Sequence, residues 1–154
     1  MDSGRSAAQV KVAREFITNS AEETISAGRE LSASLHAGQL VVLRGNLGAG
    51  KTTLVKGIAE GFRAAPEENV TSPTFNLVHE YRGPDVTLFH IDLYRIDTSR
   101  ELMALAIDDL RSEPGAILLV EWGEKFGEIQ SQSDGEVAIE VLGETQRCVS
   151  LRIS

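Results

Sequence analysis

The chain has 154 residues, which is one ordinary domain with enough length to bury a hydrophobic core. Hydrophobic residues make up 42% and charged residues 25%, as in globular proteins, and the longest apolar stretch is too short to cross a bilayer. The net charge is −8, whereas a protein that binds nucleic acid by itself usually has an excess of basic residues. Direct, tight binding to naked RNA or DNA is therefore disfavoured.

The first twenty residues contain basic side chains but no apolar segment of the kind found in secretory signals. The single cysteine, Cys148, has no internal disulfide partner and alternates with apolar residues, which favours a packed thiol in a reducing compartment. We therefore expect a cytoplasmic protein. Residues 1–19 are predicted to be a flexible N-terminal extension, and residues 20–154 a single domain.

Helix and strand patterns alternate from the start of this domain. Ser20 and Glu23 form a predicted capping box, and the apolar residues behind it recur at helical spacing until Gly38 stops the helix. The continuous apolar run at 40–43 predicts a strand buried on both faces, and residues 54–62 carry one apolar helical face.

The middle of the chain continues the alternation. Residues 66–73 are polar and punctuated by proline, which predicts a loop, whereas 75–81 and 86–91 have the pattern of two strands joined by a turn. Residues 98–110 are typical of a helix that opens with a second capping box, and 116–120 form a second all-apolar strand. Alternating residues near the C-terminus predict an antiparallel pair of strands, 137–141 with 149–153, near a sheet edge.

A glycine-rich segment between the first buried strand and the helix after it fits the pattern G-x-x-x-x-G-K-[ST] throughout. It consists of Gly45, Asn46, Leu47, Gly48, Ala49, Gly50, Lys51 and Thr52, with Thr53 next. Glycines let the backbone wrap a triphosphate closely, and the new helix adds its positive dipole end. Lys51 is expected to reach the β- and γ-phosphates, and the Thr52 hydroxyl to ligate Mg²⁺. Together with the alternation, this predicts a P-loop NTPase-like three-layer α/β fold with a central mixed, mainly parallel sheet.

Two acids stand where apolar strands end, and a P-loop needs an acid across the site to hold magnesium or to order the attacking water. Asp92 follows one strand and Glu121 the other. Because ligands bind at the carboxyl ends of strands in open α/β sheets, both are candidates, and the residues alone do not choose between them. Each could instead be a helix cap or a surface acid.

Other residues remain open to two interpretations. Trp122, the only tryptophan, could pack in the core or cover the nucleotide. Ser72 and Thr74 lie where switch loops sense a γ-phosphate with a hydroxyl, but an ordinary Ser-Pro turn explains them equally well. His90 lies inside a strand pattern, which favours a structural role.

Taken together, four motifs resemble one family, TsaE, over residues 22–147. They are the glycine-rich segment through Thr53, then Ser72-Pro73-Thr74-Phe75, then His90-Ile91-Asp92-Leu93-Tyr94-Arg95, then Glu121-Trp122. The resemblance implies an ATPase that binds ATP or ADP with Mg²⁺ and is needed to make threonylcarbamoyladenosine in transfer RNAs that read codons starting with adenine. It also implies TsaB and TsaD as protein partners, with ATP hydrolysis resetting their complex and tRNA contacted only through that complex.

The same resemblance implies roles for individual residues. Lys51, Asp92 and Glu121 match catalytic positions, and Glu121 with Thr52 would hold the magnesium. Thr74 matches a switch-like loop that contacts the nucleotide.

Two further residues, Thr24 and Arg147, match positions where family members approach the adenine end of the nucleotide. Trp122 belongs to the Glu121-Trp122 motif and is counted among the candidate nucleotide-binding residues. Asn46 departs from the family's usual aspartate, which removes one negative charge beside the phosphates.

Two alternatives to a partner-dependent ATPase follow from the P-loop alone. A small-molecule kinase would need an acceptor pocket and usually an arginine-rich lid, and no such segment stands out. The second alternative is a nucleotide-gated binding module that hydrolyses almost no ATP by itself. It overlaps with the partner-dependent ATPase, because a partner often completes the catalytic site of such a protein.

Overall fold

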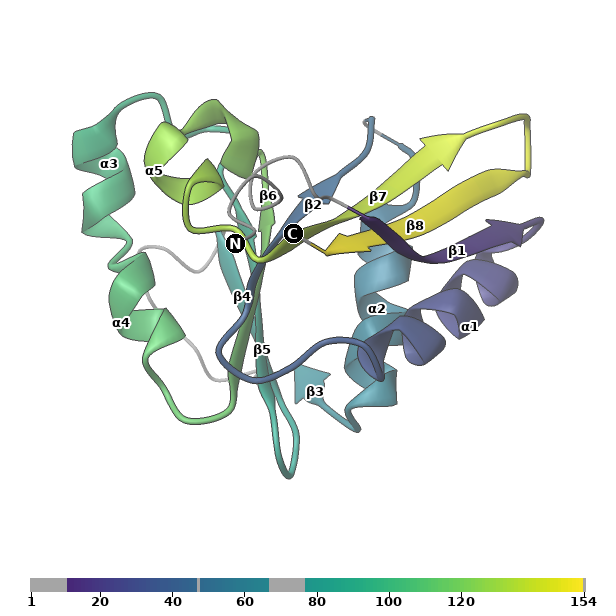
Figure 1. Cartoon of the computed structure of the whole chain (residues 1–154), viewed down its shortest axis with the longest axis horizontal. Coiled ribbons are helices and arrows are strands. Elements are labelled where there is room, and N and C mark those ends of the chain that lie inside the picture. The colour runs from purple at the N-terminus through teal and green to yellow at the C-terminus, as the bar shows by residue number, and fades with distance from the viewer. Residues whose placement is uncertain (1–10, 47, 67–76, 154) are drawn as a thin grey trace, which may run out of the picture.

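The computed structural model describes residues 11–46, 48–66 and 77–153. In this part of the chain one eight-stranded mixed sheet has the order β1-β8-β7-β2-β6-β5-β4-β3 (Figure 1). The strands are β1 (Lys11–Thr18), β2 (Leu40–Arg44), β3 (Ala65–Pro66), β4 (Val78–Arg82), β5 (Thr87–Asp92), β6 (Ala116–Glu121), β7 (Gly135–Val141) and β8 (Arg147–Ile153). The helices are α1 (Ala21–Ser32), α2 (Lys51–Gly61), α3 (Ser99–Ala104), α4 (Ile107–Arg111), α5 (Gly127–Gln130) and the 3₁₀ turn η2 (Gly123–Lys125).

Parallel pairing is concentrated at the centre of the sheet. Strands β7, β2, β6 and β5 are joined by parallel pairs, whereas β1 and β8 on one side and β4 and β3 on the other add antiparallel pairs. This arrangement confirms the predicted α/β fold with a mixed sheet. The expectation that the sheet is mainly parallel holds only for the four central strands, because the strands on both sides of them pair antiparallel. The carboxyl ends of β2, β5 and β6 consequently meet at one edge.

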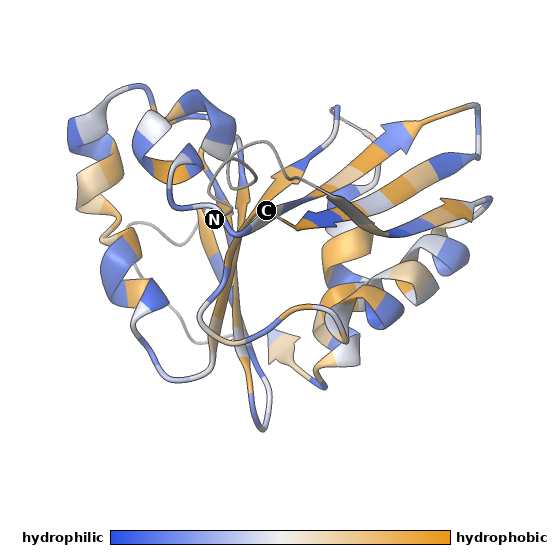
Figure 2. Cartoon of the chain, viewed as in Figure 1, coloured by the Kyte–Doolittle hydropathy of each residue, from blue (hydrophilic) through white to orange (hydrophobic). Residues whose placement is uncertain are grey.

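Helices cover both faces of the sheet, which gives the predicted three layers. Figure 1 shows α1 and α2 on one side and α3, α4 and α5 on the other. Two apolar clusters fill the spaces between the layers. The α1–α2 cluster is built around Leu31 of α1 with Leu54 and Ile58 of α2, and the other cluster is built around Phe89 and Leu118. Figure 2 shows hydrophobic residues along the central strands, as expected for strands buried on both faces. Within the described residues, no helix has both the length and the apolar composition to cross a membrane.

The helix that begins at Lys51 is held by a close approach between two helix backbones. A Cβ on Gly28 of α1 would lie 2.6 Å from the carbonyl oxygen of Leu54, and one on Gly57 of α2 would lie 2.2 Å from that of Ile25. Neither position has room for a side chain, so the two helices touch through their backbones. This contact fixes the position of α2 against α1.

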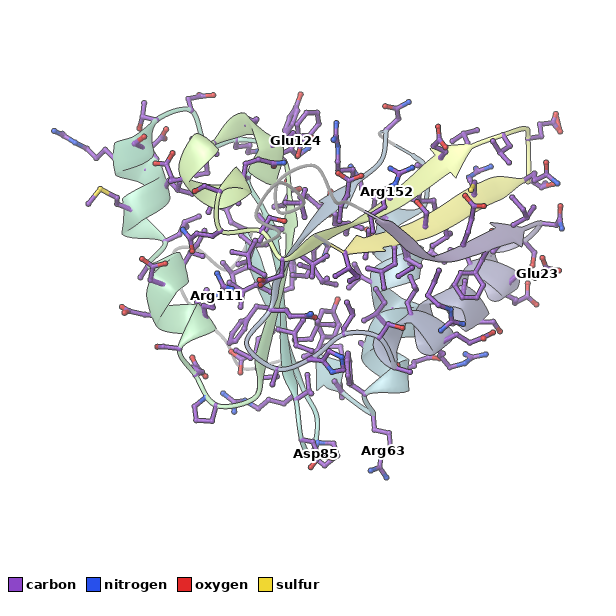
Figure 3. The ribbon with its side chains drawn as sticks, in the orientation of Figure 1. Glu23, Arg63, Asp85, Arg111, Glu124 and Arg152 are labelled. Carbon is purple, nitrogen blue, oxygen red and sulfur yellow. The ribbon has the colours of Figure 1, made fainter. Side chains whose placement is uncertain are left out.

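On the opposite face, Arg111 (labelled in Figure 3) pins the end of α4 to the sheet. Its guanidinium donates to the Asp134 carboxylate at 2.8 Å and to the Gly38 carbonyl at 3.0 Å. The same Asp134 carboxylate accepts the backbone N–H of Leu40, the first residue of β2. The network therefore joins one helical layer to the strand that leads to the glycine-rich segment.

The prediction of a flexible extension over residues 1–19 is wrong for residues 11–18. These residues form β1, which pairs antiparallel with β8 and makes the edge of the sheet. Phe16 packs against the α1–α2 cluster, and the Thr18 side chain is buried. The strand was hidden in the sequence because its outward positions are mixed and Phe16 is its only large inward apolar side chain among those described.

Two helix boundaries also differ from the prediction. The helix after Ser20 ends at Ser32, and the chain then continues in tight turns that still bury Leu35. The predicted helix over 98–110 is two helices, α3 and α4, separated at Ala106, which has a left-handed φ of 52°. Leu105 and Ile107 are both buried, which one straight helix could not achieve for residues two apart.

The remaining predicted elements agree with the structure, except that the strand predicted over 75–81 begins at Val78 as β4, and residues 75–76 lie outside the described residues. Ser20 and Thr98 cap their helices, and the C-terminal strands pair antiparallel as β7 and β8. The predicted loop at 66–73 lies outside the described residues apart from Pro66, which belongs to β3.

Candidate functional site

The glycine-rich segment forms the turn between β2 and α2. Gly48 and Gly50 have φ values of 80° and 105°, a left-handed conformation that disfavours other residues. Gly50 is the N-cap of α2, and no acidic residue lies in the first turn of that helix. The free N–H groups and the positive dipole end of α2 are therefore available to an anion.

A cavity of about 690 Å³ lies in front of this turn. It is lined by Asn46, Gly48, Gly50, Lys51, Thr52, Asp92, Tyr94, Glu121 and Trp122. The structure thus gathers the glycine-rich segment and both strand-end acids around one hollow. Every lining residue except Tyr94 is a predicted site residue or one of the loop glycines.

Glu121 is the most constrained acid of this cavity. Its side chain is only 9% exposed, and its Oε1 atom lies 3.1 Å from Nζ of Lys51. Its Oε2 atom lies 2.5 Å from Nε2 of His90, which comes from the neighbouring strand β5. Nζ of Lys51 also donates to the Gly45 carbonyl oxygen at 2.7 Å. The lysine is therefore held against the turn by two oxygen acceptors.

These neighbours determine the ionisation of Glu121. Burial by itself raises the pKa of the Glu121 carboxyl, but the hydrogen bonds and charges of His90 and Lys51 outweigh it, so the pKa lies below its usual value. Glu121 is consequently a carboxylate at neutral pH, and it can accept hydrogen bonds or bind a cation.

Asp92 and Glu121 lie side by side because β5 and β6 are parallel and pair these two residues in register. Asp92 is half-buried, and its Oδ1 atom accepts the backbone N–H of Tyr94 at 3.0 Å. The chain beyond it is fastened by Lys125, which donates to three carbonyl oxygens there, those of Leu93, Tyr94 and Ile96. The two acids therefore form a fixed pair at the carboxyl edge of the sheet.

Trp122 faces the cavity and has a strained backbone, with a φ of 64°. Its ring centroid lies 5.3 Å from that of Tyr94 and 5.7 Å from Nζ of Lys51. The ring is half-buried and also packs against the core cluster beneath α3. The tryptophan therefore packs against the core and also lines the cavity, and a role in covering the nucleotide stays a prediction.

A second cavity, of about 340 Å³, lies on the other side of the glycine-rich turn. Thr24 of α1 and Arg147 of β8 line it, together with Thr53. The hydroxyl of Thr24 is 2.8 Å from that of Thr18, and both side chains are buried. Gly48 and Gly50 border both cavities, so the turn forms a partition between them.

Arg147 is held more tightly than its predicted role in nucleotide binding suggests. Its Nε atom donates to the carbonyl of Ala49 at 3.1 Å, and one terminal nitrogen donates to the carbonyl of Gly143 at 3.0 Å. Arg147 therefore ties the turn between β7 and β8 to the glycine-rich segment.

Three predicted site residues, Leu47, Ser72 and Thr74, lie outside the described residues. Sequence reasoning also missed two residues that contact the site, His90 and Tyr94. The signal for His90 was its spacing, because it precedes Asp92 by two positions and so lies on the same face of β5.

The donors around the larger cavity match the preferences of Mg²⁺, which takes oxygen ligands and usually keeps waters and substrate phosphates. The Thr52 hydroxyl lines the cavity beside the two carboxylates, Asp92 and Glu121. In the part of the chain that the structure covers, no group of three or more histidine, cysteine, aspartate or glutamate residues could hold a metal. The site therefore fits a magnesium ion that phosphate oxygens help to bind, and not a closed protein cage.

The fold and this turn define the class: the chain has a P-loop NTPase-like α/β fold. The family model of the threonylcarbamoyl adenosine biosynthesis protein TsaE matches residues 18–149. The chain therefore belongs to the TsaE family, which takes part in tRNA threonylcarbamoyladenosine biosynthesis.

Relatives with the printed name tRNA threonylcarbamoyladenosine biosynthesis protein TsaE match most of the chain. The Rickettsia felis protein is 36% identical over 88% of this chain and 78% of its own length. The Aquifex aeolicus protein is 35% identical over 92% of this chain and 98% of its own length. The crystal structure of Bacillus subtilis YdiB superposes with a TM-score of 0.68 at 28% identity, covering 94% of this chain and 86% of that one.

Proposed function

We propose that the chain is a magnesium-dependent ATPase that assists a complex of TsaB and TsaD in threonylcarbamoyl modification of tRNA in the cytoplasm. The observation that carries this proposal is the meeting of Lys51, Thr52, Asp92 and Glu121 at one cavity in front of the glycine-rich turn. A triphosphate needs these groups together: backbone N–H groups and an ammonium for its charge, and oxygen ligands for its metal.

Lys51 and the N-terminus of α2 would bind the β- and γ-phosphates. The Thr52 hydroxyl and the Glu121 carboxylate would hold Mg²⁺, which neutralises charge that develops on the phosphate oxygens. Asp92, fixed next to Glu121 by strand register, would orient the attacking water. The adenosine would extend past Gly48 and Gly50 into the second cavity, toward Thr24.

The ion pair between Lys51 and Glu121 favours slow hydrolysis by the isolated chain. Nζ of Lys51 is held by Glu121 and by the Gly45 carbonyl, so a nucleotide must compete with both for the ammonium. A partner that stabilises the nucleotide-bound arrangement would speed turnover, as partners do in other P-loop switches. The net charge of −8 agrees with contact to tRNA only through that partner complex.

The proposal is tested by measuring free phosphate released from ATP by the chain alone and with purified TsaB and TsaD. Release that rises with the complex and requires Mg²⁺ is the expected result. No stimulation by a complex shown to assemble would reject the partner-dependent ATPase, and labelled phosphate on an acceptor molecule would indicate a kinase.

A further inference from the structure

His90 is a buried polar residue to which the proposed chemistry gives no role. It lies in β5, its side chain is 9% exposed, and its Nε2 atom is 2.5 Å from Oε2 of Glu121. Leu88, the preceding residue on this strand face, is fully buried, and His90 is buried beside it, so the imidazole needs a hydrogen-bonding partner. Glu121 is that partner.

The two oxygens of Glu121 thus have different partners. Oε1 faces Lys51 at 3.1 Å, whereas Oε2 is bonded to His90. The carboxylate cannot rotate to give both oxygens to the lysine without breaking the bond to His90. Lys51 is consequently paired with only one carboxylate oxygen.

We propose that His90 is a positioning residue, which anchors one oxygen of Glu121 so that only the other oxygen faces Lys51 and the phosphate cavity. This inference rests on the proposed function of the cavity. It gives the chain a way to release Lys51 to a polyanion while Glu121 stays in place. Without the hydrogen bond to His90, Glu121 would be free to pair with the Lys51 ammonium through both oxygens and to move with the ammonium toward the phosphates.

The geometry of the contact agrees with this role. A carboxylate oxygen accepts hydrogen bonds, so Nε2 of His90 is the donor to Oε2 of Glu121. Partners of this kind behind a metal-binding side chain typically change metal affinity or activity about 10- to 100-fold when removed.

The test compares three substitutions of His90. Gln places a donor near the position of Nε2 and is expected to restore the anchor, whereas Asn is too short and Leu has no donor. His36→Leu, an exposed histidine substitution outside both cavities, is the matched control. Each variant is titrated with Mg²⁺ at fixed ATP, with Trp122 fluorescence as the readout, and with ATP in the absence of metal.

We expect His90→Leu and His90→Asn to need about tenfold more Mg²⁺ for half of the fluorescence change. Metal-free ATP affinity should be less affected, and His90→Gln should stay close to the wild type. Equal Mg²⁺ requirements for Gln, Asn and wild type would overturn the proposal. If the wild type itself binds no ATP, the proposed function fails instead.

A measurement without nucleotide separates these two failures. In imidazole ¹⁵N spectra of the free protein, Glu121→Ala should shift the Nε2 resonance of His90 and leave that of His36 in place. An unmoved His90 resonance would overturn the proposal, whatever the protein binds.

Discussion

The Lys51 ammonium and the Glu121 carboxylate form an ion pair of 3.1 Å across the floor of the larger cavity. Both side chains are almost buried, at 11% and 9% exposure, so the pair is shielded from solvent. In the proposed function, two interactions replace this ion pair when the nucleotide binds. The phosphates would bind Lys51, and the metal would bind Glu121. Ligand binding would therefore exchange partners and create no unpaired buried charge.

The pH dependence of stability should report this pair. The pKa of Glu121 in the folded chain lies below the 4.5 of an unperturbed glutamate, so its contribution to stability is present above that value and is lost as pH falls through the folded pKa. In urea unfolding, the free-energy difference between wild type and Glu121→Gln should shrink from pH 7 toward acid. Glu113→Gln, an exposed substitution, is the control, and a difference independent of pH would show that Glu121 contributes no linked stability.

Trp122 should report nucleotide binding, because it is the only tryptophan and Nζ of Lys51 lies 5.7 Å from its ring. Movement of the ammonium toward phosphates would change the electrostatic environment of the indole. We expect the emission to change on addition of Mg²⁺ and ATP in the wild type. If the emission of Trp122 does not change while calorimetry shows saturation with ATP, the ammonium of Lys51 does not move away from the indole ring.

Arg147 should affect nucleotide affinity through the shape of the turn. Its Nε atom holds the Ala49 carbonyl, a hydrogen bond to a charged donor that contributes about 1.5–3 kcal/mol, or about tenfold or more in affinity if the turn loosens. Arg147→Ala should therefore raise the dissociation constant for ATP in calorimetry. Arg152→Ala (Arg152 is labelled in Figure 3) removes an arginine of the same strand that pairs with Glu136, and it should bind as the wild type does. Equal affinities of the two variants would exclude the tether.

The strand β1 should contribute to the stability of the domain. Phe16 packs against the α1–α2 cluster, whereas its neighbour Ile17 is 52% exposed on the other face. Phe16→Ala should cost about 2 kcal/mol of unfolding free energy, and Ile17→Ala much less. Thermal or urea unfolding of both variants checks the difference. Similar values would mean that residues 11–18 behave as the extension that the sequence suggested.

Most of the site could be predicted because its residues are defined by local pattern. A glycine-rich turn ending in Lys51 and Thr52 specifies a loop conformation, and the acids Asp92 and Glu121 are placed by the ends of apolar strands. Their register, which puts them side by side, follows from the parallel pairing of β5 with β6.

What the sequence did not predict depends on tertiary contacts. The hydrogen bond between His90 and Glu121 joins two strands that are far apart in sequence, so no local sequence pattern predicts it. The break at Ala106 opposes the strong helix propensity of alanine, and it forms because Leu105 and Ile107 both reach the core. Arg147 was predicted to bind nucleotide, yet its bond to Ala49 could be seen only in the folded chain.

The most direct test of the account is calorimetric titration of the wild type, Lys51→Ala and Lys56→Ala with ATP and Mg²⁺. Lys56 is exposed on the same helix and lines neither cavity, so its substitution removes an equal charge outside the site. The account predicts that the wild type and Lys56→Ala bind alike, and that Lys51→Ala binds about 10- to 100-fold more weakly, as expected for loss of hydrogen bonds from a charged group to phosphate. Equal binding by all three proteins would contradict the assignment of the cavity in front of the glycine-rich turn as the ATP site.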